Sequence, residues 1–293
     1  MAVTSVHRSI YSTSASDTRR RLMDRFMAVL VYFCAALSVS CLLVVLGYVL
    51  LRGAPALNLA FFTEQPLPYG SVGGGVAPAI VGTVTMLLVA SLIAVPIGIG
   101  TAIYLSEFGR GNFARTVRFA LDLLAGIPSI VVGVFVWALL VRQVIGQYSG
   151  LAGSVALAII MVPIITRTVE EILRLVTNGL REAAFALGVP HWRTILGVVL
   201  PTARAGVITG IMLSLARAGG ETAPLLLTAL GNQFFNFNLL EPVGSLPVQI
   251  YNYAVSPYDD WHTKAWGSAL VLITVIGVFS LLTRFFTRQA RLK

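Results

Sequence analysis

The sequence predicts an all-α polytopic membrane protein with six transmembrane helices, on three observations. Hydrophobic residues make up 57% of the 293 residues and charged residues only 11%, whereas a soluble domain spends about a quarter of its residues on charge. Several apolar runs exceed the roughly 18 residues that indicate a membrane span. Most basic residues flank those runs, as is typical of membrane proteins. No polar stretch is long enough for a separate soluble domain.

Each predicted span is an apolar run of about 20 residues, because a helix of that length crosses the hydrocarbon core at about 1.5 Å per residue. The first run, 27–51, precedes Ala54-Pro55-Ala56, a pattern typical of signal-peptide cleavage sites. The apolar core of a signal peptide is only about 7–15 residues long, so this longer run predicts a transmembrane helix. The six spans are predicted at 27–51, 79–105, 119–141, 147–166, 205–229 and 265–283.

Two regions are expected along the chain. Residues 1–26 are basic and rich in Ser and Thr, and they predict a flexible cytoplasmic N-terminal tail. Residues 27–293 predict one transmembrane domain, which includes a cytoplasmic segment at about 167–204. Proline occurs in four of the spans, where it predicts interrupted or kinked helices. These prolines are Pro96, Pro128, Pro163 and Pro224.

The distribution of Lys and Arg predicts the orientation of the chain. In a six-span topology, seventeen of these residues fall on the side of the two termini and three on the other side. Basic loops face the cytoplasm, so both termini are expected there. The three residues on the opposite side are Arg52, Arg142 and Lys264.

The net charge and the cysteines do not indicate a nucleic-acid partner, a disulfide or a metal site. The charge of +9 comes mostly from residues beside the spans, and no basic surface interleaved with aromatic residues indicates nucleic-acid binding. Cys34 and Cys41 share the first apolar run. They are expected to be small polarizable packing residues, without a disulfide or metal.

The segment 167–204 carries more apolar residues than a simple connection needs. It predicts two short amphipathic helices separated at Gly188-Val189-Pro190, with small residues at Ala183 and Ala184 that permit close approach of another surface. Two interpretations remain open: a helix that packs back on its own membrane domain, and a docking element for a cytoplasmic partner.

This segment resembles the EAA loop of ABC importer permeases. The matching positions in "EAAFALGVPHWRTILGVVLP" are Glu182, Ala183, Ala184, Gly188, Leu200 and Pro201. The stretches "GIPSIVVGVFVWALLV", "MVPIITRTVEEIL" and "ARAGGETAPLLLTALGNQFF" are similar to the phosphate-specific branch of that family. The resemblance covers most of the chain from about Gly73 to the last helix, and the N-terminal tail is outside it.

The resemblance implies a type I ABC importer permease fold in the inner membrane. It also implies a related second permease chain, two cytoplasmic ATPase subunits that hold ATP and Mg, and an extracytoplasmic phosphate-binding protein. The EAA loop would dock in a groove of the ATPase subunit. In this sequence that assigns coupling to Glu182, Ala183, Ala184, Gly188 and Pro201.

The chemistry of the residues is consistent with transport rather than catalysis. A P-loop needs Lys followed by Ser or Thr, and here Lys264 precedes Ala265 while Lys293 is the last residue. The three histidines lie outside the spans, so no imidazole base is available at membrane depth. No catalytic residues and no cofactor are therefore expected in this chain.

Charge within an apolar run is the strongest indication of a functional site. Arg217 and Glu221 are four residues apart in the fifth span, so a continuous helix would place both on one face, and charge at membrane depth is usually functional. A buried structural ion pair is one interpretation. A transient contact for an anion is the other, since the guanidinium fork suits phosphate.

Other residues would assist such a contact. Gly219, Gly220 and Pro224 would give the backbone local flexibility, and Arg167 is a second candidate along the substrate path. Asp122 is expected to pair with Arg118 at a helix end. The external segment 231–264 is expected to contain an interfacial helix near 246–255 and to dock the binding protein.

Two alternatives to phosphate import stay open from the sequence. One is import of another oxyanion, molybdate or sulfate. The other is an ion-coupled secondary transporter or channel, which would need no ATPase dock. A membrane enzyme is less compatible with the residues, because the constellation of catalytic groups is missing.

Overall fold

The computed structural model describes residues 15–68, 70 and 73–289, and helices are the only regular secondary structure in these ranges. The chain divides between Leu51 and Arg52 into two compact units. The first unit contains α1 (Ala15–Gly53) as far as Leu51, and its described side chains are almost all exposed. This helix includes residues predicted to be a flexible tail, since it begins well before 27. Residues 1–14 of that predicted tail lie outside the described residues.

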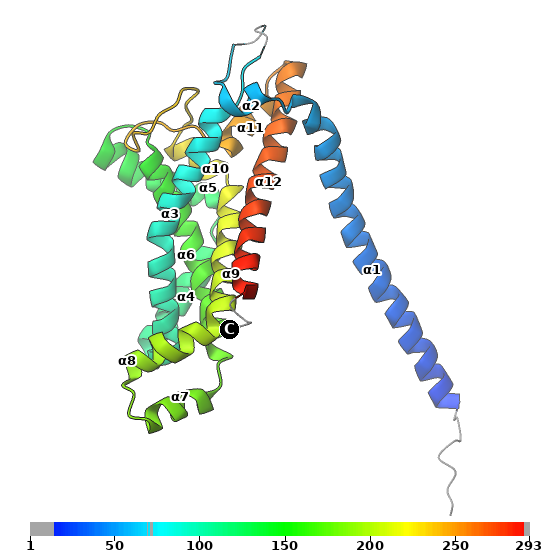
Figure 1. Ribbon diagram of the computed structural model, residues 1–293, viewed down its shortest axis with the longest axis vertical. Coiled ribbons are helices and arrows are strands. Elements are labelled where there is room, and N and C mark those ends of the chain that lie inside the picture. Colours follow the sequence, from blue (N-terminus) through cyan, green and yellow to red (C-terminus); the bar gives the residue numbers. More distant parts are fainter. Residues whose placement is uncertain (1–14, 69, 71–72, 290–293) are drawn as a thin grey trace, which may run out of the picture. The chain divides into compact units, whose positions relative to one another are not determined.

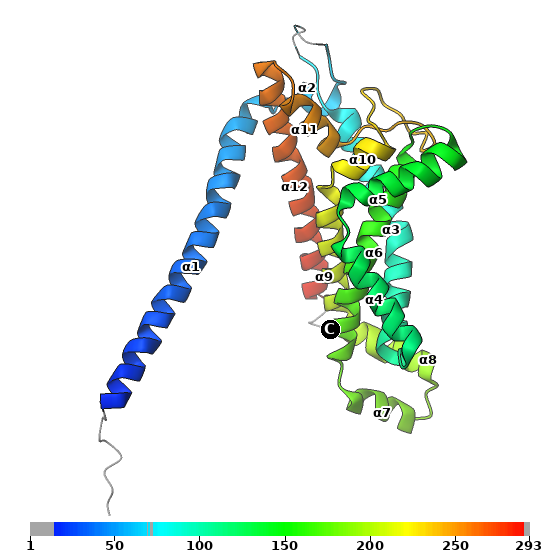
Figure 2. The ribbon, with the colours of Figure 1, turned by 180° about the vertical axis from the view of Figure 1, so that it is seen from behind.

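The second unit is a helical bundle (Figure 1). Its helices are α2 (Leu59–Thr63), α3 (Ala77–Ile103), α4 (Asn112–Gly126), α5 (Ser129–Val136), α6 (Gly150–Arg174), α7 (Asn178–Ala186), α8 (His191–Thr194), α9 (Leu200–Gly219), α10 (Ala223–Thr228), α11 (Leu246–Ala254) and α12 (Asp259–Gln289). Wider π-helical turns continue three of them, at Tyr104–Phe108, Trp137–Ile145 and Ile195–Val199. Figures 1 and 2 place α2 and α11 at one end of the bundle, the α11 end, and α7 at the other, the α7 end.

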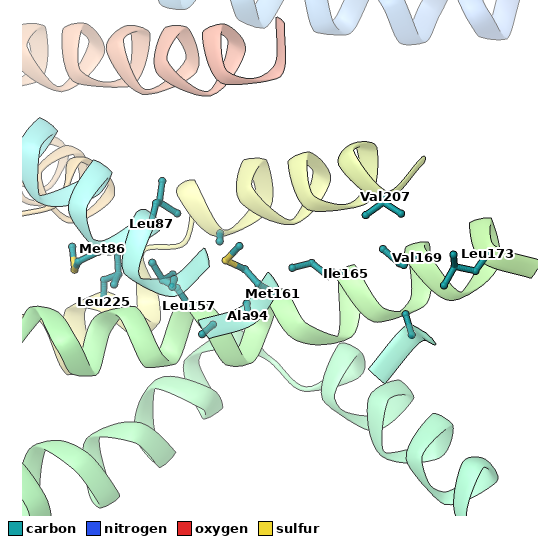
Figure 3. Packing of buried hydrophobic residues seen from close by; sticks show 14 of the residues in the cluster. Met86, Leu87, Ala94, Leu157, Met161, Ile165, Val169, Leu173, Val207 and Leu225 are labelled. Atoms are coloured by element: carbon teal, nitrogen blue, oxygen red, sulfur yellow. The ribbon is translucent and has the colours of Figure 1, made fainter. Parts of the chain in front are cut away.

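Helix α6 is the centre of the bundle, with fifteen buried residues. It packs against α3 and α9, and one apolar cluster runs along all three helices (Figure 3). Met161 and Ile165 of α6 are fully buried there, beside Ala94 of α3 and Val207 of α9. In lipid the helices associate by close packing rather than by hydrophobic burial, so this cluster fixes their arrangement.

Glycine brings the packed helices close together. A side chain on Gly98 of α3 would place its Cβ 2.7 Å from Cγ2 of Ile165, and one on Gly210 of α9 would lie 3.0 Å from Cγ2 of Thr168. Both approaches are closer than ordinary van der Waals contact. Small residues at helix interfaces are the usual means of tight packing in membranes.

Two of the predicted spans are broken. Helix α4 and the stretch Ser129–Ile145 meet at an angle of 102°, so the predicted third span, 119–141, is bent at Pro128, as the proline predicted. The fifth, predicted at 205–229, ends at Gly219 and resumes in α10. Proline explains both restarts, since Pro128 precedes α5 directly and Pro224 lies in the first turn of α10, where its missing N–H costs nothing.

Pro96 and Pro163 behave differently from the prediction of interruption. Both lie inside continuous helices, α3 and α6. Neighbouring helices and local adjustments satisfy freed backbone groups at such sites in membranes. Helix α6 also continues to Arg174, so the first residues of the predicted cytoplasmic segment 167–204 belong to this helix.

By length and composition, five helices of the described residues can cross a membrane, or six if the bent pair is one span. These are helical stretches that include α1, α3, α6, α9 and α12, together with the bent pair. The all-α membrane fold predicted from the sequence is confirmed. The count of six depends on the bent pair crossing as a single broken span.

A second apolar cluster forms the α11 end. Phe61 of α2, Leu246 and Tyr253 of α11 and Ala265 of α12 are buried together. The predicted interfacial helix near 246–255 corresponds closely to α11. Burial raises the pKa of the Tyr253 phenol, a shift that its hydrogen bond with Gln249 reduces, so the hydroxyl stays protonated at neutral pH.

Candidate functional site

The break between α9 and α10 places two charged residues where helical hydrogen bonding is interrupted. Arg217 lies in the last turn of α9, and Glu221 lies in the three-residue connection to α10. A cation near the carboxyl end of a helix is stabilised by the helix dipole. Helix α9 ends between the two residues, at Gly219, within the stretch where Gly219, Gly220 and Pro224 were expected to give the backbone local flexibility.

Arg217 and Glu221 are only loosely paired. Nε of Arg217 lies 3.9 Å from Oε1 of Glu221, and their side chains are 58% and 16% exposed. That distance exceeds a hydrogen bond, and the guanidinium lies largely outside the protein interior. In this chain the donors of Arg217 are open to a further partner, while Glu221 stays close enough to reduce the local positive charge.

The residues around the break differ in how tightly they are packed. A Cβ on Gly219 would lie 3.3 Å from Cδ1 of Ile276 on α12, so this glycine lets α12 approach. Gly220 has no such neighbour: a Cβ there would meet only its own chain, at the carbonyl of Arg217. Pro224 is buried, and Gly133 of α5 lets its ring approach closely.

A second charged site surrounds Glu170 of α6, whose side chain is only 3% exposed. Its Oε1 accepts hydrogen bonds from Nε of Arg118 at 2.8 Å and from Nη2 of Arg174 at 2.6 Å. Nη1 of Arg167 lies 3.8 Å from the other oxygen, Oε2, which accepts no hydrogen bond from the described residues. A buried carboxylate is thus compensated by three arginines from two helices.

Arg167, the second predicted path residue, belongs to this cluster. Its Nη2 donates to the backbone oxygen of Arg118 at 3.0 Å and forms an ion pair with Asp122. The expected pair of Asp122 with Arg118 is wrong, because Arg118 turns instead to Glu170 and to the carbonyl oxygen of Leu105. Gly210 of α9 packs against Thr168, the neighbour of Arg167. Arg217 lies about two helical turns beyond Gly210, so Arg167 and Arg217 lie at different depths, about 10 Å apart along the bundle at about 1.5 Å per residue.

Sequence reasoning missed Glu170 as a central residue. It stands in "TVEEIL" beside Glu171, and nothing local distinguishes a buried glutamate from its exposed neighbour. The one available signal is the spacing to Arg167 and Arg174, three residues before and four after, which places all three side chains on one face of a helix.

Helix α7 stands apart from the bundle at its α7 end (Figure 1). It begins at Asn178, so Glu182 lies in the middle of the helix. Glu182 and Ala183 are exposed, whereas Ala184 is buried. Around them Leu180, Phe185, Leu187 and Trp192 expose a large part of their apolar side chains.

The chain reverses after α7 at a glycine, as predicted. Gly188 has φ = +76°, a left-handed conformation that residues with side chains rarely adopt. The next helical stretch, from His191 onwards, is continuous with α9. The second of the two predicted short helices is therefore the beginning of a long one, and Pro201 lies exposed within it.

An apolar cavity of about 220 Å³ opens between α3, α9 and α12. It is lined by Leu87 and Leu88 of α3, Leu215 of α9, and Leu272 and Ile276 of α12. Its lining is apolar, apart from a few hydroxyl side chains, so it offers no charged contact for an anion.

A broken span that carries an exposed arginine, and a short exposed helix between two spans, are features suited to a membrane transport subunit. Residues 94–291 match the family described as "Binding-protein-dependent transport system inner membrane component". The chain belongs to this family and is a multi-pass membrane component of a transport system.

Relatives make the comparison more specific. The chain is 43% identical over 270 residues to "Phosphate transport system permease protein PstA" of Pasteurella multocida, covering 92% of this chain and 94% of that one. It is 41% identical to the protein of the same name from Yersinia pestis, over 90% of each chain.

Solved structures share the fold. A chain of the MetNI methionine ABC transporter in an inward-facing conformation has a TM-score of 0.58 at 21% identity, over 74% of this chain and 94% of that one. A chain from a bacterial ABC transporter that imports alginate has a TM-score of 0.57 at 16% identity, over 92% and 99%. The likeness confirms the predicted type I ABC importer permease fold.

Proposed function

We propose that this chain is a membrane-spanning permease subunit of an ATP-driven phosphate importer. The names of its relatives support the substrate, and the family supports the role. It would form the translocation pathway together with a second, related permease chain. Sulfate or molybdate import, and ion-coupled secondary transport, are the alternatives that the experiments must exclude.

Energy would come from two ATPase subunits that bind ATP and Mg and dock on α7. The observation that carries this proposal is the exposed apolar surface of α7 and the turn after it, held outside the bundle. Single exposed apolar residues are ordinary, but a grouped patch indicates an interaction surface. Coupling is assigned to Glu182, Ala183, Ala184, Gly188 and Pro201.

Both termini and α7 would face the cytoplasm, as the distribution of basic residues favours. The α11 end would then face outward and receive an extracytoplasmic phosphate-binding protein. Residues 231–245 are suited to that contact because they fold over the start of α6: the backbone N–H of Leu151 donates to the carbonyl of Leu239 at 2.7 Å. Phe234 and Phe237 of this segment are exposed.

Phosphate would meet Arg217 at the helix break and Arg167 nearer the α7 end. An ion must bind well enough to enter a path and weakly enough to leave it. Glu221 would prevent Arg217 from holding a divalent anion too tightly. The exposure of Arg217 and the 3.9 Å separation from Glu221 support a guanidinium that can exchange partners.

Purification of the chain from its native membrane tests the docking assignment. An ATPase subunit should co-purify, and Leu187→Ser should weaken its retention, since the burial of one leucine side chain contributes about 1.5–3 kcal/mol. Leu59→Ser, at the α11 end, changes an equally exposed leucine and should leave retention unchanged. A chain that purifies without any ATPase subunit, yet transports, would favour the ion-coupled alternative.

A further inference from the structure

Helix α7 is joined to the bundle by a charged side chain, in addition to its two chain connections and its buried Ala184. Arg181, on α7, is only 14% exposed and turns towards the bundle rather than outwards. Its Nη2 and Nε donate to the two oxygens of Glu107 at 2.7 and 3.1 Å. Glu107 is 4% exposed, so the pair forms a two-pronged, largely desolvated ion pair.

The same guanidinium also binds the end of α6. Its Nη1 donates to the carbonyl oxygen of Val176 at 2.5 Å, and its Nη2 donates to that of Leu173 at 3.0 Å. The last carbonyls of a helix lack intrahelical partners, and a cation there is favoured by the helix dipole. Arg181 therefore donates hydrogen bonds both to carbonyl groups at the end of α6 and to the carboxylate of Glu107.

Glu107 belongs to the π-helical turn Tyr104–Phe108 that ends α3. Its neighbour Phe108 packs edge-on against the ring of His191, 4.8 Å between centroids, and His191 packs in the same way on Phe185 of α7 at 5.5 Å. Nε2 of His191 lies 4.0 Å from Oε2 of Glu107. The end of α3, the end of α6, α7 and the start of α8 thus meet around one carboxylate.

Only arginine can make this set of contacts. The guanidinium has five donors in a rigid plane, and here they reach two carboxylate oxygens and two carbonyls. A lysine ammonium carries the same charge as a point on a flexible stem and cannot reproduce the fork. Replacing Arg181 by lysine therefore tests whether the role of this residue depends on the geometry of its hydrogen bonds or only on its positive charge.

We propose that Arg181 and Glu107 are positioning residues that transmit displacement of α7 to the ends of α3 and α6. Because α3 and α6 form the packed core of the bundle, a partner that moves α7 would move these two helices as one body. The pair would set how much transport each cycle of ATP hydrolysis produces. This inference rests on the proposed function of α7 as the ATPase dock.

The test uses the complete transporter in proteoliposomes and measures three quantities: ATPase subunit retained, ATP hydrolysed, and phosphate imported per ATP. Arg181→Lys keeps the charge beside Glu107, so the chain should fold and retain the ATPase subunit. Phosphate imported per ATP should fall about tenfold or more, within the range of typical coupling energies. Arg204→Lys, an exposed arginine near the start of α9, is the matched control and should match wild type.

A double-mutant cycle separates a coupled pair from two independent residues. Glu107→Gln and Arg181→Gln should each lower phosphate imported per ATP, and the double variant should be no worse than either single one. Additive losses, or an Arg181→Lys variant that imports as much phosphate per ATP as wild type, would overturn the inference. A wild-type complex with no ATPase subunit or no ATP-dependent import would instead overturn the proposed function.

Discussion

At the scale of single residues, Glu170 shows how a buried charge is kept in the bundle. A buried ion is tolerated only when partners replace the water it has lost. Arg118, Arg167 and Arg174 are those partners, and each keeps part of its side chain exposed. Removing the carboxylate would leave these arginines crowded against one another without compensation.

Glu170→Gln should therefore lower the free energy of unfolding by about 3 kcal/mol, the lower end of the range for breaking a buried pair. Glu171→Gln changes the exposed neighbour on the same helix and should alter stability by less than about 0.5 kcal/mol. Thermal unfolding of both variants in detergent measures the difference. Equal stability of the two variants would mean that the cluster around Glu170 stabilises nothing.

Arg217 and Glu221 give the functional prediction at this scale. Arg217→Gln should abolish phosphate uptake while the complex still assembles, because the exposed guanidinium is needed for the anion rather than for packing. Glu221→Gln should slow turnover. Uptake normalised to assembled complex is the measurement, for both single variants and the neutral double variant. A double variant with normal uptake would show that the pair only holds the helix break together.

At the scale of elements, the turn after α7 depends on one backbone conformation. Gly188 has φ = +76°, and a Cβ there would meet nothing within 4 Å, so a substitution acts through the backbone alone. Gly188→Leu should cost about 1–2 kcal/mol locally and uncouple ATP hydrolysis from transport or release the ATPase subunit. Gly188→Asn should be milder, since Asn tolerates this conformation.

Gly197→Leu is the control for size, because Gly197 has equal space around it and no positive φ. ATP hydrolysis and phosphate uptake are measured for all three variants in the assembled complex. If Gly188→Leu matches wild type in assembly and in transport, the turn after α7 is not part of the coupling element.

Local patterns explain which elements could be predicted from the sequence. The span 79–105 and the helix near 246–255 carry their own apolar pattern and proline start, and both correspond closely to α3 and α11. The turn at Gly188 has a local signal as well. The 102° bend between α4 and α5 had only Pro128 as a signal, and a proline kinks, starts or ends a helix according to its neighbours.

The candidate site residues also divide into those that the sequence indicates and those that only the fold brings together. Arg217 is visible because it interrupts an apolar run, and α7 because it carries exposed apolar residues outside one. Glu107 is recognised only after folding, since its partner Arg181 is 74 residues away in the sequence. Glu170 has a local signal in its spacing to Arg167 and Arg174, but its third partner, Arg118, is 52 residues away. No local pattern encodes such distances, and a charged residue beside a span is usually solvated.

At the scale of the whole molecule, the bent pair of α4 and α5 decides the topology. If it crosses the membrane as one broken span, there are six crossings and both termini lie in the cytoplasm. The pair begins near the α7 end, where Glu107 at the end of α3 meets Arg181, and leads to the start of α6 near the α11 end, which favours this sixth crossing. Reporter fusions at the two ends should both be active in the cytoplasm. A C-terminal reporter active only outside would contradict the six-span assignment.

The central claim is that this chain, with its partner subunits, uses ATP to import phosphate. Uptake of radiolabelled phosphate into proteoliposomes that hold the purified complex, the external binding protein and enclosed ATP tests it most directly. We expect uptake that requires ATP, persists when ion gradients are collapsed, and is not reduced by excess sulfate or molybdate. Uptake that proceeds without ATP under an ion gradient, or that sulfate or molybdate abolishes, would contradict the claim.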